Sequence, residues 1–415
     1  MAHGLPRARH HARGAGVQPR RRRTSGDPRS TSEANMDRVL KQGQPEEAGL
    51  DPHHLRVVAQ LMDEGIRTGI FPGAVLLIAV EGIIGHHAAY GHAQIVPSLR
   101  RMTLDTLFDL ASLTKVTATL PVAMRLWDAG VLDLDAPVQG VIPEFRGGGR
   151  ERVTPRHLLA HTSGLPAWRP LYLKARGKEE VLRVLCTIPL TYRPGEVVEY
   201  SDLGMILLGF LLERLAGDQL DRLFQRLVAD PLELKDTMFT PPEELRHRCA
   251  ATEGGNAVER EMAGEEGRDF PWRTHVLCGE VHDGNAHYAL GGVAAHAGLF
   301  STAEEVATIA QEWIRPSGLF SQRALVEATG LQTCGAEGPP RGLGWVLHHP
   351  GAFFAAFGKR AFGHTGFTGT SVACDPEAGV VAVLLTNRVH PRGDHDAIEQ
   401  FRPHLHAAIR KALMT

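Results

Sequence analysis

Residues 73–91 read GAVLLIAVEGIIGHHAAYG. Two apolar runs in this stretch are separated only by Glu81 and Gly82. Strand-forming runs that are joined by a two-residue turn containing glycine are typical of a β-hairpin, so the stretch predicts two antiparallel strands early in the chain. A helix is expected just before them, because Asp51–Pro52 supplies an N-cap and a first-turn proline ahead of apolar residues at helical spacing.

The strand signal returns near the end of the chain. The strand-like stretches there are GLGWVLHH (342–349), GTSVACD (369–375) and VVAVLLTN (380–387). From Leu113 to about Arg248 the pattern is mostly helical, with short breaks at Pro and Gly. Strands from both ends of the chain are therefore expected to pair with each other across a long helical insert.

This order of elements predicts an α/β fold, of the α+β kind, with two lobes. An antiparallel β-sheet flanked by helices would be built from about residues 45–110 and 285–413, where the last helix follows Pro403. An all-α lobe, about residues 111–284, would be inserted between these two parts. Ligand sites commonly lie in clefts between such units, so we expect the functional site in the cleft between the lobes.

The composition is that of a globular protein with a sizeable core. Of 415 residues, 43% are hydrophobic and 22% are charged, and the formal net charge is -2. This balance gives no indication of a nucleic-acid partner, and no stretch is apolar over the length of a membrane span. The first 35 residues are rich in Arg, Gly, Pro and Ser, so we expect a disordered tail, residues 1–35, ahead of a folded domain, residues 36–413. Arg20–Arg23 leave open a nucleic-acid contact or an export signal, although no apolar run follows them.

Cysteine usage favours a cytoplasmic location. The five cysteines are odd in number and scattered along the chain, and no export signal is visible. Reduced thiols fit this pattern better than a framework of disulfide bonds.

The stretch FDLASLTKV (108–116) places Ser112 and Lys115 three positions apart, at the expected start of a helix. Residues at i and i+3 share a helix face, so the lysine amine can reach the serine hydroxyl. A serine hydroxyl needs a neighbouring base to become a nucleophile, and a lysine whose pKa is lowered by burial can supply it. The alternative is that both residues are ordinary helix surface, because this spacing also arises by chance.

A second candidate lies in RPGEVVEYSDLG (193–204), where Tyr200 precedes a helix predicted over 202–216 and ended by Gly217. Side chains on such loops can be presented to a cleft, and a phenol held near Lys115 can carry a proton as phenolate. The alternative is that Tyr200 only packs, and that Ser201 or Asp202 is simply the N-cap of the helix.

A third candidate is FGHTGFTGTS (362–371), in which His364, Thr365 and Gly366 stand at a strand edge. A glycine there lets a substrate approach the backbone, and the strand could supply a backbone N–H to an oxyanion. His364 and Thr365 are candidates for binding a substrate carboxylate. The alternative is a glycine-rich hairpin without chemistry.

Taken together, SLTK, YSD and HTG resemble the motifs of the serine β-lactamase and penicillin-binding-protein superfamily. That family has S-x-x-K, then Y-x-N or a variant, then K-T-G or H-T-G, in this order. The supporting phrases HLLAHTSGLP (157–166) and GGVAAHAGLFSTAEEVA (291–307) look similar as well, and the resemblance covers about residues 45–413.

The resemblance implies a role for each matching residue. Ser112 would be the nucleophile of an acyl-enzyme, and Lys115 and Tyr200 would share general acid/base duty. The backbone N–H groups of Ser112 and Phe367 would form the oxyanion hole. His364 and Thr365 would face the far side of the substrate.

Two departures from the family pattern narrow the substrate. Asp202 replaces the usual asparagine, and a carboxylate beside Lys115 would raise the lysine pKa and weaken it as a base. His364 replaces the usual lysine, so the cation expected opposite a β-lactam carboxylate would be only partly present at pH 7. The chain most resembles penicillin-binding-protein-4-like serine hydrolases.

The stretch GEVHDGNA (279–286) allows two interpretations. His282 and Asp283 are expected to line the cleft. A metal site is the alternative, with candidate ligands His275, Cys278, His282, Asp283 and His287. Their spacing matches no closed zinc pattern, so we expect no metal.

The expected function is hydrolysis of a small ester or amide, with D-amino-acid peptides among the candidates, without metal or cofactor. The expected partner is this small-molecule substrate, and the sequence does not indicate an oligomeric state. One alternative is a β-lactamase or DD-carboxypeptidase. Another alternative is a ligand-binding protein of the same family without catalysis, which stays possible because Asp202 would weaken Lys115 as a base.

Overall fold

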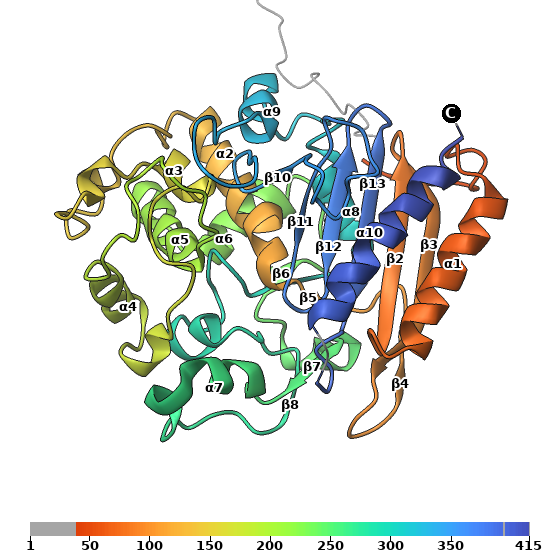
Figure 1. The fold of residues 1–415 in the computed structure, drawn as a ribbon, viewed down its shortest axis with the longest axis horizontal. Coiled ribbons are helices and arrows are strands. Elements are labelled where there is room, and N and C mark those ends of the chain that lie inside the picture. Colours follow the sequence, from red (N-terminus) through yellow and green to blue (C-terminus); the bar gives the residue numbers. More distant parts are fainter. Residues whose placement is uncertain (1–38, 393–394, 415) are drawn as a thin grey trace, which may run out of the picture. The chain divides into compact units, whose positions relative to one another are not determined.

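The fold is built around an eight-stranded sheet, seen in a computed structural model that describes residues 39–392 and 395–414 (Figure 1). The expectations for residues 1–35 lie outside these described residues. The strands of this sheet are β1 (Lys41–Gln42), β2 (Gly73–Val80), β3 (Ile83–Gln94), β4 (Arg100–Arg101), β10 (Val346–Leu347), β11 (Phe362–Thr365), β12 (Ser371–Asp375) and β13 (Val380–Thr386). Their order is β1-β3-β2-β13-β12-β11-β10, with β4 beside β3.

Strands from the two ends of the chain pair at the centre of the sheet. β13 runs antiparallel to β2, with Ala382 opposite Ile78, and β2 and β3 form the predicted hairpin. All pairings in the sheet are antiparallel except that of β1 with β3. The predicted antiparallel sheet assembled across an insert is therefore confirmed.

The strand predicted over 342–349 is wrong in extent, because only Val346–Leu347 forms a strand. Gly344 has φ 76, a left-handed conformation that interrupts an extended segment. Its α-carbon lies against the helical insert, since a β-carbon there would sit 3.3 Å from Val116.

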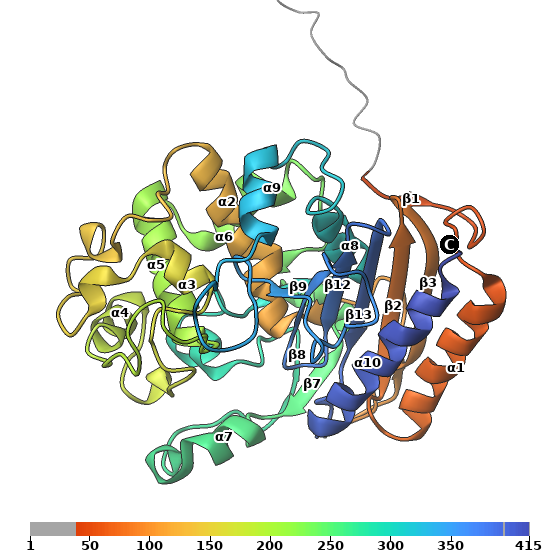
Figure 2. The same ribbon diagram turned by 45° about the horizontal axis from the view of Figure 1, so that its top comes forward.

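The sheet separates two hydrophobic cores, because successive side chains of a strand point to opposite faces. Along β2, Val75 and Leu77 enter one core, whereas Leu76 and Ile78 enter the other. The second core is covered by α1 (Pro52–Arg67) and α10 (His395–Ala412), which lie together on that face in both views (Figures 1 and 2). The first core continues into the helical insert.

The last helix begins earlier than predicted, at His395, and Pro403 lies inside it. A proline removes one backbone hydrogen bond and usually ends a helix. Here the apolar residues Ile398, Leu405 and Ile409 continue on one side of the helix through the proline and are buried in the second core. This burial stabilises the helix on both sides of Pro403.

The remaining helices cover the other side of the sheet and form the insert. They are α2 (Leu120–Asp128), α3 (Pro155–Leu159), α4 (Lys178–Leu185), α5 (Asp202–Ala216), α6 (Leu220–Phe224), α7 (Ala257–Ala263), α8 (Ala303–Gln311) and α9 (Gln322–Thr329). Two small sheets join them: β5 (Phe108–Asp109) and β6 (Met238–Phe239) flank β9 (Leu299–Ser301), and β7 (Ala251–Gly254) pairs with β8 (Val276–Cys278). Within residues 39–392 and 395–414, no helix is long and apolar enough to cross a membrane.

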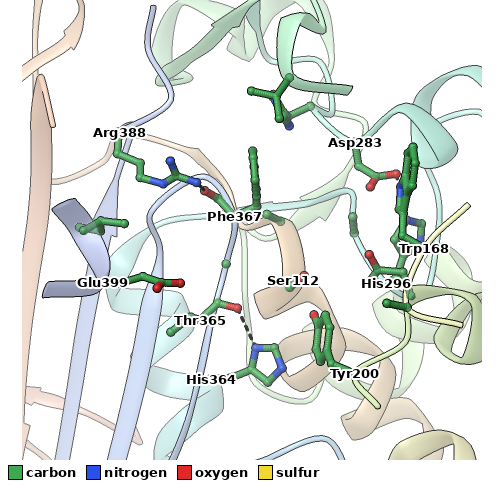
Figure 3. Close-up of a pocket in the computed structure, with 18 of the residues that line it drawn as sticks. Ser112, Trp168, Tyr200, Asp283, His296, His364, Thr365, Phe367, Arg388 and Glu399 are labelled. Atoms are coloured by element: carbon green, nitrogen blue, oxygen red, sulfur yellow. Dashed lines mark hydrogen bonds and ion pairs between the residues drawn. The ribbon is translucent and has the colours of Figure 1, made fainter. Parts of the chain in front are cut away.

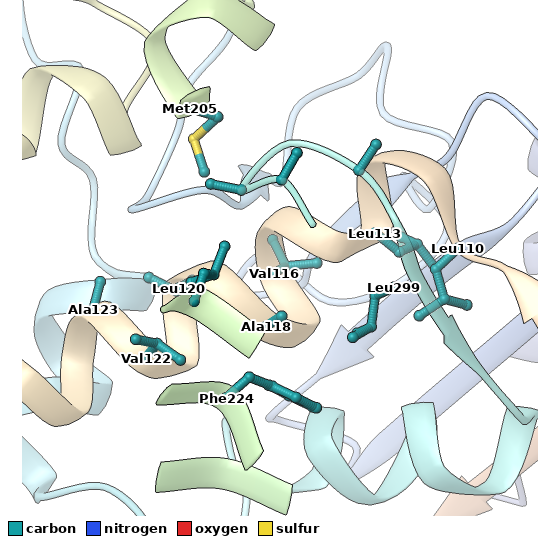
Figure 4. Close-up of a cluster of buried hydrophobic side chains, with 14 of the residues drawn as sticks. Leu110, Leu113, Val116, Ala118, Leu120, Val122, Ala123, Met205, Phe224 and Leu299 are labelled. Atoms are coloured by element: carbon teal, nitrogen blue, oxygen red, sulfur yellow. The ribbon is translucent and has the colours of Figure 1, made fainter. Parts of the chain in front are cut away.

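The segment after Ser112 is anchored in the first core. Leu113, Val116 and Leu120 pack there with Met205 of α5 and Phe224 of α6 (Figure 4). This core is continuous from the sheet to the insert. The structure therefore does not separate two lobes by their cores, and the division into two lobes stays a prediction.

Candidate functional site

A pocket of about 500 Å³ opens where the insert meets β11 (Figure 3). It is lined by every candidate site residue from the sequence except Lys115, namely Ser112, Tyr200, Asp202, His282, Asp283, His364, Thr365, Gly366 and Phe367. Residues far apart in the chain thus share one cavity. Lys115 lies directly beneath it, fully buried.

Ser112 lies on a tight turn and not on the α-helix that was predicted to begin there. Residues Ala111–Leu113 form a 3₁₀ turn after β5, a π-helix spans Lys115–Thr119, and regular α-helix starts only at Leu120. Ala111 has φ 46, an unusual conformation for a residue with a side chain. Its N–H donates to Asp109 Oδ1 at 2.9 Å, which stabilises the turn that exposes Ser112 to the pocket.

Lys115 is held by three acceptors. Its Nζ donates to Ser112 Oγ at 2.8 Å and to the backbone carbonyl of His296 at 2.9 Å, and it lies 2.8 Å from Asp202 Oδ1. The Tyr200 ring centroid is 4.8 Å from the same nitrogen. The predicted convergence of Ser112, Lys115 and Tyr200 is therefore present in the structure.

The protonation of this group follows from its surroundings. Burial alone would lower the pKa of Lys115, but the charge of Asp202 and the contact with Tyr200 raise it above its ordinary value. Burial raises the pKa of Tyr200, and hydrogen bonds with Lys115 and Ser112 only partly oppose that effect. At neutral pH Lys115 is therefore an ammonium ion and Tyr200 a neutral phenol, in line with the raised Lys115 pKa that Asp202 led us to expect.

The Tyr200 ring lies among three side chains whose role there the sequence did not indicate. His161 packs on it with ring centroids 4.6 Å apart, and the His161 Nδ1 accepts a hydrogen bond from the Ser201 N–H at 3.1 Å. The guanidinium carbon of Arg341 is 5.4 Å from the Tyr200 ring centroid, and the His364 ring is 5.9 Å away. The motif HTSG contains His161, to which the sequence analysis gave no catalytic role.

His364 does not carry the partial charge that was expected, and its role in binding the substrate stays a prediction. It is buried, and burial together with the charges of Lys115 and Arg341 holds its pKa well below the ordinary value, so the ring is neutral at pH 7. Its Nδ1 donates to the Thr365 carbonyl at 2.8 Å, since a carbonyl oxygen can only accept. The neutral ring therefore presents Nε2 as an acceptor, which disfavours a carboxylate contact there.

The structure shows a packing reason for the missing side chain of Gly366, while close approach of a substrate stays a prediction. A β-carbon at this position would lie 2.1 Å from Thr370 Oγ1 and 2.5 Å from the Leu110 carbonyl oxygen. The close neighbours of Gly366 are thus the turn formed by residues 366–370 and the segment that leads to Ser112. A glycine is required for these two segments to touch.

Two arginines that the sequence analysis missed hold the 366–370 turn. Arg388 Nη2 donates to the carbonyl of Phe367, and the guanidinium carbon lies 4.8 Å from the Phe367 ring centroid. Arg402 of α10 donates from Nη2 to the carbonyls of Thr370, at 2.9 Å, and Gly366, at 3.3 Å. No motif links either arginine to the turn, because both contacts arise from tertiary packing.

Asp283 lines the pocket beside Trp168 (Figure 3), and His282 lines it with its ring stacked on Phe367, the ring centroids 5.4 Å apart. The His282 ring pairs with Glu253, and Asp283 Oδ1 lies 2.9 Å from His296 Nε2. Burial alone would raise the pKa of Asp283, but the charge and hydrogen bond of His296 lower it to about 2. Within the described part of the chain, no group of three or more His, Cys, Asp and Glu residues is placed to hold a metal ion.

Asp202→Asn is expected to move the acid limb of the pH–activity profile to lower pH. A base works in its deprotonated form, and removal of the Asp202 carboxylate lowers the pKa that it now raises on Lys115. The measurement is kcat/KM against pH, with Asp269→Asn, at an exposed position outside the pocket lining, as the control. An acid limb that stays in place or moves to higher pH would contradict this view of Lys115.

Comparisons with known proteins agree with the motifs. The sequence pattern of the Beta-lactamase family matches residues 56–405. The chain is 34% identical over 377 residues to an N-acetylmuramyl-L-alanine amidase of Bacillus subtilis (strain 168), covering 83% of each chain. It is 32% identical over 389 residues to a protein of Escherichia coli (strain K12) that carries the provisional name D-alanyl-D-alanine carboxypeptidase, covering 85% of this chain and 86% of that protein.

Solved structures show the same fold. EstCE1, described as a hydrolase with promiscuous acyltransferase activity, superimposes with a TM-score of 0.68 at 22% identity, over 87% of this chain and 98% of that one. A penicillin-binding-protein homologue from Caulobacter crescentus gives a TM-score of 0.68 at 22% identity, over 88% and 99%. Since the family pattern spans most of the sequence, the chain belongs to the Beta-lactamase family, within the superfamily of serine β-lactamases and penicillin-binding proteins, and is a hydrolase of that serine type.

Proposed function

We propose that this enzyme cleaves an amide bond through an acyl-enzyme on Ser112. The observation that carries the proposal is the Ser112 hydroxyl in the pocket, 2.8 Å from the buried Lys115 amine and beside Tyr200. A nucleophile within hydrogen-bond reach of a base, which is itself positioned by a third group, is the arrangement that acyl transfer requires. Here Asp202 is the third group.

The amide bond would be cleaved in two acyl-transfer steps. Ser112 Oγ bonds to the substrate carbonyl carbon, and its proton passes to the Lys115–Tyr200 pair while the carbonyl oxygen becomes an oxyanion. The pair then returns the proton to the leaving nitrogen as the C–N bond breaks. A water molecule attacks the ester that remains, gives its proton to the pair, and the released Ser112 oxygen regains a proton.

The reactive form holds one proton fewer than the resting pair. Lys115 is an ammonium ion and Tyr200 a neutral phenol at rest, so one of these two protons must leave before Ser112 can be deprotonated. The pair titrates as a unit, and its apparent pKa sets the acid limb of activity. The oxyanion would be received by the backbone N–H groups of Ser112 and Phe367, with Thr365 facing the substrate.

The proposed substrate class rests on the names of the relatives and on the positive charge of Arg341. Both names describe cleavage of an amide bond whose nitrogen belongs to an alanine, and in a D-alanyl-D-alanine carboxypeptidase the alanine that leaves carries a free carboxylate. Arg341 lines the pocket at 7% exposure, and its Nε and Nη1 have no hydrogen-bond acceptor among the described residues. A buried cation whose N–H groups lack acceptors is costly, so an anionic group on the substrate would stabilise it.

Arg341→Met is expected to lower kcat/KM only for substrates that carry this carboxylate. With an N-acylated alanine that has a free carboxylate, we expect kcat/KM to fall by roughly 10- to 100-fold, because a charge-assisted hydrogen bond contributes about 1.5–3 kcal/mol. With the same compound amidated at its C-terminus, the rate should stay within about threefold. Arg152→Met, at an exposed position outside the pocket lining, is the matched control. If kcat/KM fell equally with both compounds, Arg341 would instead position the Tyr200 ring.

The direct test of the proposed function is an acyl or phosphonyl adduct on Ser112. Intact-mass measurement after incubation with a fluorophosphonate, p-nitrophenyl esters, N-acyl alanines and nitrocefin would show which compounds acylate the enzyme. We expect adducts from the fluorophosphonate and esters, turnover of N-acyl alanines, and slow reaction with nitrocefin, because the neutral His364 adds no cation to that of Arg341. Absence of any adduct would favour a ligand-binding relative without catalysis.

The cytoplasmic location also remains a proposal. Its support is that all five cysteines, which lie in the described part of the chain, are free thiols, as expected in a reducing compartment. Measurement of the protein in cytoplasmic and exported fractions of its native cell would decide the question.

A further inference from the structure

We propose that Arg402, on the C-terminal helix α10, is a positioning residue that fixes the peptide supplying the second oxyanion donor. The proposal rests on the function given above, in which the Phe367 N–H receives the oxyanion. Arg402 has not been assigned any role by motif, and it lies 36 residues beyond Gly366 in the chain.

The contact is made to the same peptide unit that carries the donor. The carbonyl of Gly366 and the N–H of Phe367 belong to one peptide bond, and a trans peptide places its C=O and N–H on opposite sides. Arg402 Nη2 donates to that carbonyl at 3.3 Å, and the Gly369 N–H donates to it at 3.0 Å. Two donors on the oxygen therefore fix the plane of the peptide and the direction of the Phe367 N–H.

The contact also carries charge. Burial and the neighbouring Arg388 lower the pKa of Arg402 to about 9, which leaves the guanidinium charged at neutral pH. A cation on the carbonyl oxygen polarises the amide, and polarised hydrogen bonds reinforce one another in a low-dielectric interior. The Phe367 N–H would then be a stronger donor to an oxyanion than an ordinary amide, at no reorganisation cost during the reaction.

The turn is held from the opposite side as well. Thr368 Oγ1 donates to the carbonyl of Asp109 at 2.8 Å, and Thr370 Oγ1 donates to the carbonyl of Leu110 at 3.0 Å. These two carbonyls lie directly before the turn that presents Ser112. The 366–370 turn is thus tied to the nucleophile segment on one side and to α10 on the other, so Arg402 sets the distance between the two donors of the hole.

Arg402 itself is suited to this task. It is 5% exposed, and its Nη2 bridges the carbonyls of Gly366 and Thr370. Both contacts come from one nitrogen whose two hydrogens are fixed in the guanidinium plane, whereas a lysine amine on a flexible stem is not held in that geometry. Methionine fills a similar volume without any donor.

The test compares Arg402→Met, Arg402→Lys and the matched control Arg410→Met on the same helix with the wild type. Active sites are first counted by fluorophosphonate titration, so that unfolded protein does not enter the rates. With a p-nitrophenyl ester we expect Arg402→Met to lower kcat per active site by roughly 10- to 100-fold while KM changes by less than about threefold, because a donor displaced by a fraction of an ångström loses stabilisation of the transition state only. Arg402→Lys should recover part of kcat, and Arg410→Met should match the wild type.

A second measurement separates positioning from a structural role. An arylboronic acid forms a tetrahedral adduct with the serine oxygen and places an oxygen in the hole, so its Kd should rise by the same factor by which kcat falls. A wild type without any adduct on Ser112 would overturn the proposed function and this inference together. A wild type that is active, with kcat and boronate affinity unchanged in Arg402→Met, would overturn this inference alone, as would equal losses of kcat and 1/KM with unchanged boronate affinity.

Discussion

Ser112→Ala is expected to abolish hydrolysis of both esters and amides, lowering kcat by roughly 10⁴-fold or more. Without the Oγ atom no acyl-enzyme can form, and the described residues of the pocket lining include no other serine or cysteine. The measurement is turnover of a p-nitrophenyl ester and of an N-acyl alanine, together with intact mass after fluorophosphonate treatment. The variant should show no adduct.

The same variant is expected to stay folded, which makes the loss interpretable. Lys115 keeps the Asp202 carboxylate and the His296 carbonyl as acceptors after the hydroxyl is removed. The lost hydrogen bond contributes only about 1 kcal/mol net, so the melting temperature should fall by a few degrees at most. The backbone N–H of Ser112 remains, so a noncovalent ligand should still bind.

The matched control is Ser201→Ala, next to Tyr200. Ser201 caps α5, since its Oγ accepts from the Gly204 N–H at 3.0 Å, and loss of a cap costs about 0.5–2 kcal/mol. This variant should lose stability yet form the adduct at the wild-type stoichiometry. If Ser112→Ala retained esterase activity or an adduct, the nucleophile would be another residue.

The elements that could be predicted from the sequence have local causes. The β2–β3 hairpin follows from its two-residue turn, α1 from the Asp51 cap that accepts from the His53 N–H, and the end of α5 from Gly217, which has φ 66. Each cause lies within a few residues of its effect, where sequence patterns carry most of their information.

The nucleophile, the amine and the phenol could be found for a different reason. Ser112, Lys115 and Tyr200 come from two short motifs whose order is shared with a known family, so the resemblance placed them together before any geometry was known. The structure brings them into contact, whereas their catalytic roles stay predictions until variants are measured.

The residues that the sequence analysis missed depend on long-range packing. Arg341, Arg388 and Arg402 act on Tyr200 and the 366–370 turn only because the fold places them there. The protonation state of His364 was predicted wrongly for the same reason, since its burial and its hydrogen bond to the Thr365 carbonyl are tertiary properties. The uninterrupted α10 around Pro403 also required knowledge of the core that it covers.

Lys115→Met is the second variant with a large expected effect, a loss of roughly 10²–10⁴-fold in kcat. Methionine fills a similar space but can neither accept the Ser112 proton nor donate to the Ser112 oxygen. Because Lys115 is fully buried and pairs with Asp202, the substitution also leaves a partly buried carboxylate without its cation. We expect a loss of roughly 3 kcal/mol of stability, the lower end for broken buried pairs, since Asp202 retains some contact with water.

The double variant Lys115→Met with Asp202→Asn separates these two effects. Removing both charges abolishes the unpaired carboxylate, so the melting temperature should recover toward that of the wild type. The activity should not recover, because the group that moves the proton is still missing. Thermal melting and kcat/KM measured on all three variants decide the matter: if activity returned together with stability, Lys115 would be a structural partner of Asp202, and Tyr200 alone would have to activate Ser112.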